Sequence, residues 1–375
     1  MKLTDICDFQ GGSQPPKEEW SFDEQDGYVR MLQIRDFTQS ERVAPEYVKI
    51  SNSTKICETD DILIARYGAS IGKILTGLAG AYNVAIMRTI PDTSKIKKKY
   101  LYYYLKSSYF QNAILNVGSR AAQAGFNKED LSKLDIECPE LADQDSIVSI
   151  LEKVEAVIEK RKEELSTLDN LIKARFVELF GDININDKNW DCEPLGELCT
   201  IVRGGSPRPI DQYLGGDVPW IKIGDATDGD NIYLNSTKEH IIQEGVKKSR
   251  LVKSGSLIFA NCGVSLGFAR IITFDGCIHD GWLAMEDIDE RFEKVFLLQA
   301  LNQMTEHFRA IAPAGTQPNL NTAIMKAYKQ VIPPIELQRD FIRFVAQVDK
   351  SKVVVKKALD ETQTLFDSLM QKYFG

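Results

Sequence analysis

The sequence lacks the features that mark secreted, membrane-bound and metal-binding proteins. No apolar run approaches the roughly 18 residues of a membrane-spanning helix, and the opening MKLTDICDFQGG has no basic stretch before an apolar one. The 7 cysteines form no C-x-x-C pair, and the 3 histidines lie far apart. We therefore expect no signal peptide, membrane span, disulfide framework or metal site, as in a cytoplasmic protein.

Motifs for chemistry on nucleic acids are also lacking. No Asn-Pro-Pro-aromatic or Asp-Pro-Pro-aromatic tetrapeptide of an amino-methyltransferase occurs, and no acid-x-Lys triplet of a nuclease follows Pro91-Asp92. The turn GASIGKI from Gly68 resembles a phosphate loop, but its later echo GVSLGFA has Phe268 in place of the lysine. His279-Asp280 is more simply a structural polar pair than a catalytic one. We predict that the chain is not an enzyme, and a stand-alone DNA-modifying enzyme stays an alternative.

Charge is distributed unevenly along the chain. The net charge is −8, yet residues 27–128 hold 15 Lys and Arg against 7 Asp and Glu, whereas residues 138–182 hold 6 against 11. A second basic window, residues 245–274, ends near Arg270 and contains no acid. Local charge decides whether a polyanion docks, so these windows are candidates for a nucleic-acid surface. The alternative is that they are ordinary solvated faces.

The chain contains a tandem repeat. The segment PELADQDSI, which begins at Pro139, returns as PPIELQRDFI from Pro333, so that Gln144 corresponds to Gln338. Four further segments return in the same order at offsets of 189 to 195 residues, which indicates duplication. They are LTDICDFQGGS and LGELCTIVRGGS (with one residue inserted), MLQIRD and WIKIGD, ILIARYGASIG and LIFANCGVSLG, and QAGFN and QPNLN.

Each repeat consists of a β-rich part followed by a long helix. Short apolar runs between Gly-rich turns predict strands with some helix in residues 1–137 and 183–332. One helical stretch places Leu101, Tyr104, Leu105 and Tyr109 on one face, and we interpret it as a core stripe and not as a platform for stacking bases.

Residues 138–182 and 333–375 each carry a heptad seam of apolar residues that begins at Ile147 and Phe341. Arg161 and Arg175 interrupt the first seam, and Lys352 and Thr362 interrupt the second. Two equal seams in one chain most simply pack together. We predict an α+β fold with two β-rich domains separated by two long antiparallel coiled-coil helices, arranged as a pseudo-twofold tandem repeat.

This arrangement resembles the specificity subunit of type I restriction–modification enzymes. The matching features are the GGS elements, the IRD and IGD strand ends, the G-x-S-x-G turns and the P-x-L-x-x-Q-x-x-I entry into each helix. The resemblance implies target-recognition domains at residues 1–137 and 183–332 and helical spacers at 138–182 and 333–375. It also implies a non-catalytic subunit that binds an asymmetric, bipartite sequence of double-stranded DNA.

The same resemblance implies partners that carry the chemistry. Two modification (methyltransferase) subunits would dock on the helices, and restriction subunits would join through that complex. S-adenosylmethionine, ATP and Mg would be bound by these partners and no cofactor by this chain. A coiled-coil assembly scaffold without DNA readout is the second alternative.

Base-reading residues are expected where the two repeats differ, because heads that read different half-sites need different side chains. Residues shared by the repeats, such as Gly12 and Gly205, Ser13 and Ser206, Gln123 and Gln317, and Asn127 and Asn321, are then scaffold or phosphate contacts. The predicted DNA-binding residues are Gln33, Arg35, Arg66, Tyr67, Lys73, Lys222, Asn261 and Arg270. Off the seam, Val148, Val157, Leu171 and Phe176 are predicted to dock the modification subunits.

Overall fold

A computed structural model describes residues 1–39, 43–118, 125–227, 232–313 and 319–375, and the chain divides into two units. Unit 1 comprises Met1–Lys162 and Lys356–Gly375, and unit 2 comprises Glu163–Val355. Two helices of 40 residues each, α5 (Leu141–Phe180) and α11 (Ile335–Phe374), contribute one half to each unit. We call the rest of the units head 1 (residues 1–140) and head 2 (residues 181–334).

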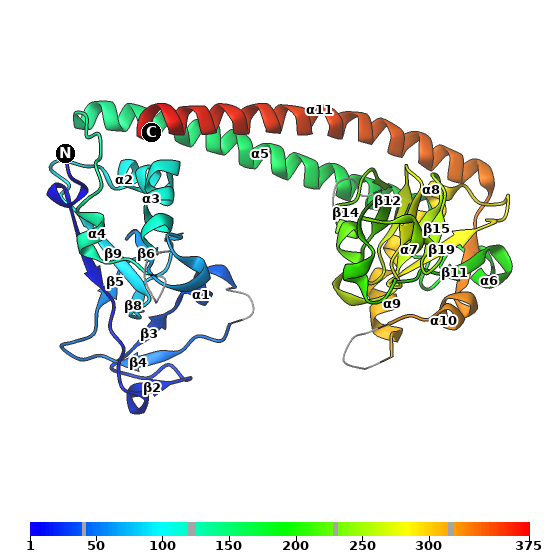
Figure 1. The fold of residues 1–375 in the computed structure, drawn as a ribbon, viewed down its shortest axis with the longest axis horizontal. Helices are drawn as coiled ribbons and strands as arrows, with labels where there is room; N and C mark the ends of the chain where they lie inside the picture. Colours follow the sequence, from blue (N-terminus) through cyan, green and yellow to red (C-terminus); the bar gives the residue numbers. More distant parts are fainter. Residues whose placement is uncertain (40–42, 119–124, 228–231, 314–318) are drawn as a thin grey trace. The chain divides into compact units, whose positions relative to one another are not determined.

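The described part of head 1 contains two sheets (Figure 1). An antiparallel sheet has the strand order β1-β9-β6-β7, and a second sheet, β2-β4-β3-β8-β5, contains the parallel pair β3 and β8. The strands are β1 (Cys7–Gly11), β2 (Trp20–Ser21), β3 (Tyr28–Leu32), β4 (Tyr47–Lys49), β5 (Ile56–Cys57), β6 (Leu63–Ala65), β7 (Ile74–Leu75), β8 (Gly80–Tyr82) and β9 (Ile86–Pro91). The helices are η1 (Leu3–Asp5), η2 (Lys17–Glu19), α1 (Ile34–Thr38), η4 (Gly68–Ser70), α2 (Lys98–Lys106), α3 (Ser108–Gly118) and α4 (Lys128–Leu131).

The described part of head 2 repeats this topology. The order β11-β19-β16-β17 corresponds to β1-β9-β6-β7, and the parallel pair β12 and β18 corresponds to β3 and β8. The strands are β10 (Asp191–Pro194), β11 (Thr200–Arg203), β12 (Leu214–Ile221), β13 (Tyr233–Leu234), β14 (Glu239–Ile241), β15 (Arg250–Val252), β16 (Leu257–Ala260), β17 (Ala269–Ile272), β18 (Gly276–Ile278), β19 (Trp282–Glu286) and β20 (Lys329–Ile332). The helices are α6 (Leu195–Leu198), η5 (Ile210–Gln212), η6 (Ile223–Thr227), α7 (Gln243–Val246), η7 (Gly263–Ser265), α8 (Lys294–Gln303), α9 (Thr305–Ile311) and α10 (Thr322–Ala327).

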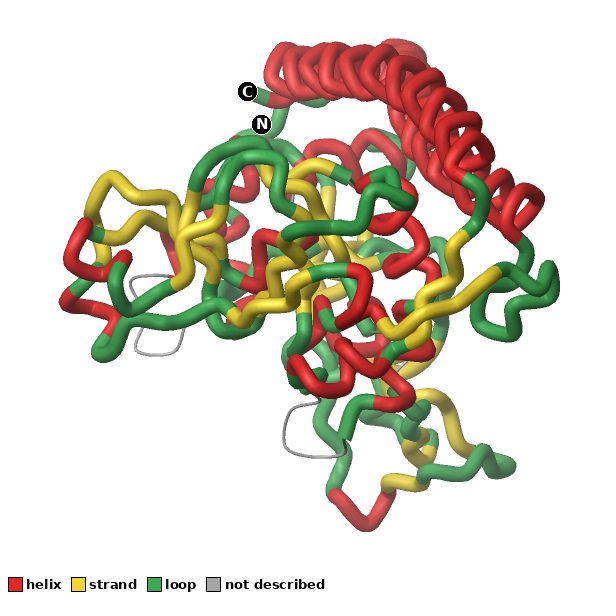
Figure 2. Tube along the Cα trace, turned by 90° about the vertical axis from the view of Figure 1, so that its right-hand side faces the viewer, coloured by secondary structure: helices red, strands yellow, loops and turns green. Residues whose placement is uncertain are grey.

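Within each unit, half of α5 runs antiparallel beside half of α11 (Figures 1 and 2). The seam positions are buried or half-buried, and the most buried are Leu151 and Ile158, at most 4% exposed in unit 1, and Phe341 and Val345, at most 2% in unit 2. The predicted fold class is therefore confirmed. The limits predicted for the target-recognition domains stay a prediction, and the helices themselves begin at Leu141 and Ile335.

Proline and glycine set the ends of both long helices. Proline lacks the amide proton that a helix interior needs, and each helix begins just after one, at Pro139 or Pro334. Each helix ends at a Phe followed by a glycine, Gly181 with φ 76° and Gly375 with φ 92°. This left-handed conformation favours glycine and lets its amide donate to a carbonyl four residues earlier.

The tyrosine-rich helix α2 lies between the strands of head 1 and the long helices of unit 1 (Figure 1). Leu101, Tyr104 and Leu105 are at most 1% exposed, which confirms the predicted core stripe, whereas Tyr109 is 38% exposed. The ring of Tyr100 packs 5.0 Å from that of Phe374, at the end of α11. Head 1 is thereby packed on both helices at once.

A buried glutamine joins each head to the helix that follows it. Gln144 accepts a hydrogen bond from the Lys97 amide at 2.9 Å and donates to the carbonyls of Lys95 (2.9 Å) and Pro139 (2.8 Å). Gln338 repeats the set with the Glu293 amide (2.9 Å) and the carbonyls of Arg291 (2.9 Å) and Pro333 (2.8 Å). Both side chains are fully buried. We call each set a glutamine joint, and it explains why the sequence repeats a glutamine after each proline.

An ion pair beside each glutamine joint has opposite polarity in the two repeats. Lys97 of head 1 pairs with Asp145 of α5 at 2.9 Å, whereas Glu293 of head 2 pairs with Arg339 of α11 at 3.0 Å. Both pairs are partly exposed, so each contributes little to stability. A head seated on the wrong helix would bring like charges together, and the reversal therefore favours the observed pairing.

We predict that Gln144→Leu loosens the first joint without affecting the second. The substitution leaves the Lys97 amide and two carbonyls without their partner in a buried place, which should cost roughly 2–4 kcal/mol. Hydrogen–deuterium exchange should accelerate around residues 95–99 and stay unchanged around residues 291–295. Gln338→Leu is the matched control and should give the reverse pattern. Unchanged exchange around residues 95–99 in Gln144→Leu would contradict the assignment of the joint.

Candidate nucleic-acid interface

The turns that follow β1, β6 and β8 in head 1 form the same backbone frame as those that follow β11, β16 and β18 in head 2. We call this the tip frame. Its hydrogen bonds match one to one and differ in length by about 0.1 Å. They are Gly12 N to Ile86 O (3.0 Å) and Gly204 N to Trp282 O (2.9 Å); Asn83 N to Leu32 O (3.1 Å) and His279 N to Ile221 O (3.0 Å); Arg66 N to Ala85 O (2.8 Å) and Asn261 N to Gly281 O (2.9 Å).

The tip frame corrects the predicted alignment of the repeats. Gly12 corresponds to Gly204 and not to Gly205, so the inserted residue follows this turn instead of lying within the strand. A Cβ atom on Gly12 would lie 2.1 Å from the carbonyl oxygen of Asn83, and one on Gly204 would lie 2.2 Å from that of His279. Only glycine allows this close approach of two backbones.

The corrected alignment shows that each tip carries an arginine, supplied by a different strand. In head 1, Arg66 follows β6, stacks on the Tyr67 ring at 5.0 Å and lies 3.1 Å from the Cβ position of Gly11. In head 2, Arg203 occupies the place of Gly11, is exposed, and donates from Nε to the carbonyl of Asp280 at 3.0 Å. The sequence alignment placed its one-residue insertion before Gly204. Gly11 was therefore not matched with Arg203, and Arg203 was missed.

Three of the predicted DNA-binding residues are at least partly exposed at the tip of head 1. Arg66 is half-buried, Tyr67 is 39% exposed and Lys73 is exposed. Among the described residues, Arg66 and Lys73 have no carboxylate partner. The Tyr67 ring packs against Gly125, where an added Cβ would be 2.4 Å from two ring carbons. These side chains form an aromatic and cationic surface.

Three other predicted residues are engaged by carboxylates. Arg35 pairs with Glu46 at 2.7 Å, Gln33 also donates to Glu46, and Lys222 pairs with Glu239 at 2.6 Å. The backbone amides of Gln33 and Lys222 occupy equivalent positions, since each donates to an aspartate three residues on. The side chains of Gln33 and Lys222 differ, yet each contacts a nearby glutamate, Glu46 in head 1 and Glu239 in head 2.

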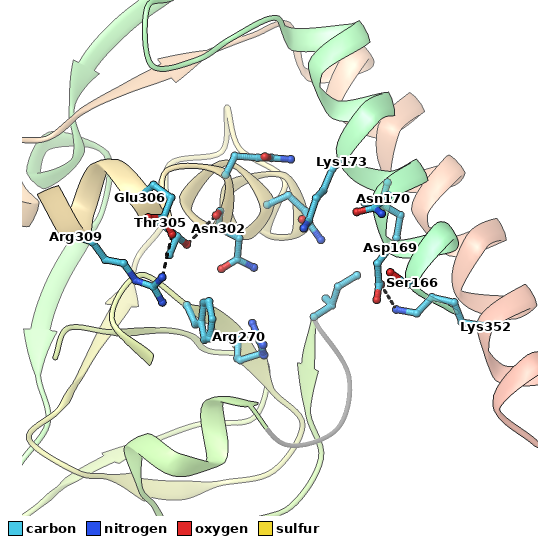
Figure 3. Close-up of a pocket in the computed structure, with 15 residues that line it drawn as sticks. Ser166, Asp169, Asn170, Lys173, Arg270, Asn302, Thr305, Glu306, Arg309 and Lys352 are labelled. Carbon is cyan, nitrogen blue, oxygen red and sulfur yellow. Dashed lines mark hydrogen bonds and ion pairs between the residues drawn. The ribbon is translucent and has the colours of Figure 1, made fainter. Parts of the chain in front are cut away.

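The structure does not place Asn261 or Arg270 at an exposed tip. Asn261 is fully buried and donates to the Leu320 carbonyl at 3.1 Å, so its side chain is not available to a base. Arg270 is 5% exposed, donates to the Ala269 carbonyl and lines a pocket that Lys173 and Asp169 of α5 also line, from across the pocket (Figure 3). Asn261 directly follows β16 and Arg270 lies in β17, and the sequence comparison did not show that either side chain is buried.

The shared residues have mixed outcomes. Asn127 and Asn321 cap the helices α4 and α10 by accepting from amides three residues on, as expected of scaffold. Gln123 and Gln317 lie outside the described residues. The G-x-S-x-G turns are three-residue 3₁₀ helices, η4 and η7, in both heads, so the supposed phosphate loop is one of two copies of a structural turn.

Much of the basic excess counted in the sequence is used inside the units. Lysines of head 1 pair with carboxylates of α5 at about 3 Å: Lys97 with Asp145, Lys99 with Glu152 and Lys106 with Glu155. In the window 245–274, Arg250 pairs with Glu286 and Lys253 with Asp275. The basic windows are thus not free surfaces as a whole, and among the described cations of residues 27–128 only Lys49, Lys55, Arg66 and Lys73 lack a carboxylate partner.

The predicted docking residues divide into two classes. Val148 (8% exposed) and Phe176 (1%) pack into the cores of their own units, so they are not available to a partner and that prediction is wrong. Val157 and Leu171 are 42% and 45% exposed. Leu365, which corresponds to Leu171 in the repeat, is 51% exposed and was missed because only the first helix was considered.

A family model described as type I restriction modification DNA specificity domain matches residues 1–168 and 187–362. The chain belongs to this family. The MjaIX specificity subunit of Methanocaldococcus jannaschii is 22% identical over 54% of this chain and 48% of that subunit, and the MjaVIII specificity subunit of the same organism is 20% identical over 88% and 81%. The chain thus spans about half the length of the first of these relatives.

A solved chain from a type I restriction–modification system has the same fold. Its TM-score is 0.63 at 16% identity, over 100% of this chain and 96% of that one. This likeness shows that the two chains share a fold. Among the described helices, none is both long and apolar enough to cross a membrane.

His279, a tip residue of head 2, has a lowered pKa. Its Nδ1 lies 2.9 Å from the Gly281 amide, which donates to it, and 3.0 Å from Asp280 Oδ1, which itself accepts from Ser206. Burial lowers the pKa of His279 below its usual 6.5, against the opposing effect of Asp280. At neutral pH the ring is therefore uncharged, and the hydrogen bond that Nδ1 accepts from Gly281 favours the tautomer with the proton on Nε2.

We predict that NMR titration of His279 shows the Nε2–H tautomer and a midpoint below 6.5. Because the folded pKa is depressed, the unfolded chain binds more protons at acidic pH, so His279 should lower stability as the pH falls through 6.5. Asp280→Asn should lower the midpoint further, since it removes the nearby negative charge. A midpoint above 6.5, or an Nδ1–H tautomer, would contradict this description.

Proposed function

We propose that this chain directs a methyltransferase and restriction complex to one asymmetric, bipartite DNA sequence and performs no chemistry itself. Head 1 would read one half of the site and head 2 the other. The observation that carries the proposal is the tip frame, which has the same backbone in both heads but different side chains. A backbone that is the same in both heads, with side chains that differ, suits two domains that recognise different base sequences.

The partners follow from the same proposal. Double-stranded DNA binds the heads, two modification subunits dock on the long helices, and restriction subunits join through them. S-adenosylmethionine, ATP and Mg belong to those partners, and the complex works in the cytoplasm. The helices act as a spacer, because each head is held to both of them through its glutamine joint and core.

The test is methylome sequencing of cells that express the chain with its modification subunits. A single methylated motif of two half-sites with a fixed gap supports the proposal. A gel shift of the purified complex on DNA with and without that motif separates sequence reading from a scaffold role. Methyl transfer by this chain without partner subunits would overturn the non-catalytic assignment.

We predict that Arg66→Ala relaxes recognition at one position of one half-site only. The guanidinium, held over Tyr67, can pair with the O6 and N7 of guanine, and its loss should cost roughly 1–3 kcal/mol of discrimination. Arg203→Ala should do the same in the other half-site. Methylation rates on substituted duplexes measure both effects.

Lys99→Ala is the matched control for charge, because Lys99 pairs with Glu152 on α5 and should leave both half-sites unchanged. If Arg66→Ala weakens all DNA sequences equally, Arg66 is a phosphate contact. If Arg66→Ala behaves like Lys99→Ala, its role in recognition is refuted.

We predict that Leu171→Glu and Val157→Glu abolish co-purification with the modification subunit, because a charge replaces an apolar contact in the interface. Leu365→Glu should have the same effect as Leu171→Glu if two partner copies bind equivalent surfaces. Val264→Glu, on the η7 turn of head 2, is a control at a side chain that is 90% exposed and should leave assembly intact. Retained assembly in the helix variants would place the docking surface elsewhere.

A further inference from the structure

Asn83 and His279 occupy the same position in the tip frame. Their amides donate to the ends of equivalent strands, and their carbonyls accept from Ile86 and Trp282 at 2.9 Å in both cases. Their side chains also make the same local contact. Asn83 Oδ1 accepts from the amide of Ala85 at 3.1 Å, and His279 Nδ1 accepts from the amide of Gly281 at 2.9 Å.

This shared contact leaves one donor on each side chain without a partner. No described group makes a hydrogen bond to Asn83 Nδ2 or to His279 Nε2. Both residues are partly exposed, and the His279 ring is supported by Trp220, with ring centroids 5.6 Å apart. Each donor is therefore held in place by its turn and available for a ligand.

The two donors differ in reach and in number of protons. Nε2 of a histidine lies farther from the backbone than Nδ2 of an asparagine, and it offers one N–H where the amide offers two. A donor of this kind suits acceptors such as purine N7, guanine O6 or thymine O4 in the major groove. An identical backbone thus presents a different donor in each head.

We propose that Asn83 and His279 are specificity-determining residues, each donating a hydrogen bond to a base edge in the half-site read by its own head. This rests on the proposed function and names residues for it beyond the tip arginines. The inner atom of each side chain maintains the turn, and the outer atom reads the base.

Two substitutions at His279 separate these roles. His279→Asn keeps an acceptor for the Gly281 amide but replaces the far-reaching Nε2–H by a shorter amide donor like that of Asn83, whereas His279→Gln keeps a donor at the reach of Nε2 but loses the inner acceptor. Methylation by the complete complex is measured on duplexes substituted one base pair at a time, beside the melting temperature of each variant. We expect His279→Asn to melt normally and lose discrimination on the order of 10- to 100-fold at one base pair of one half-site.

His279→Gln should retain the recognised sequence and melt at a lower temperature. In head 1, Asn83→Asp keeps the acceptor for Ala85 and replaces the outer donor, so it should change the other half-site only. The reverse order for the His279 variants, with normal recognition in His279→Asn, would show a purely structural role and overturn the proposal. So would an equal loss on all sequences, which marks a phosphate contact. If the parent complex methylates no bipartite motif, the proposed function fails before the variants are compared.

Discussion

The buried side-chain amides of Gln144 and Gln338 fix each head to the start of the long helix that follows it. Each side-chain amide hydrogen-bonds one backbone amide of a head and two carbonyls, one of them on Pro139 or Pro333, just before the long helix. Buried backbone groups need such partners, so the direction in which the helix leaves its head is fixed. The other helix ends on the same head, as Phe374 does against Tyr100 and Phe180 against Phe296. A head cannot turn on one helix without losing its packing on the other.

The two repeats share the geometry of the glutamine joint but differ in the charged side chains beside it. The glutamine joints agree to about 0.1 Å, yet the neighbouring ion pair is Lys97–Asp145 in one repeat and Glu293–Arg339 in the other. The polar breaks in the seams also differ. Arg161 bonds the side chain of Thr362 in unit 1, and Lys352 pairs with Asp169 at 2.8 Å in unit 2. Polar groups at seam positions specify the register of a helix pair. A different polar pair therefore sets the register in each unit.

Repetition and periodicity were sufficient to predict the α+β tandem repeat, the seams and the ends of the helices. They did not reveal which side of a strand or helix a residue occupies. Val148 and Phe176 lie off the seam but face their own heads, and Asn261 and Arg270 follow or lie on buried strands. An ungapped alignment of the first strands would have paired Gly11 with Arg203. Ion pairing between distant segments, such as Lys106 with Glu155, is not visible in a sequence count of charges.

The proposed function requires that the two heads, each fixed to the same pair of helices, read half-sites at a set spacing. Deletion of residues 162–168 from α5 together with 353–359 from α11 tests it most directly, because it removes one heptad from each helix at the boundary of the units. The pairs Arg161–Thr362 and Lys352–Asp169 are kept. The helices shorten by about 10 Å, and methylome sequencing should show a gap shorter by roughly three base pairs. An unchanged gap, in a folded and assembled complex, would contradict the account.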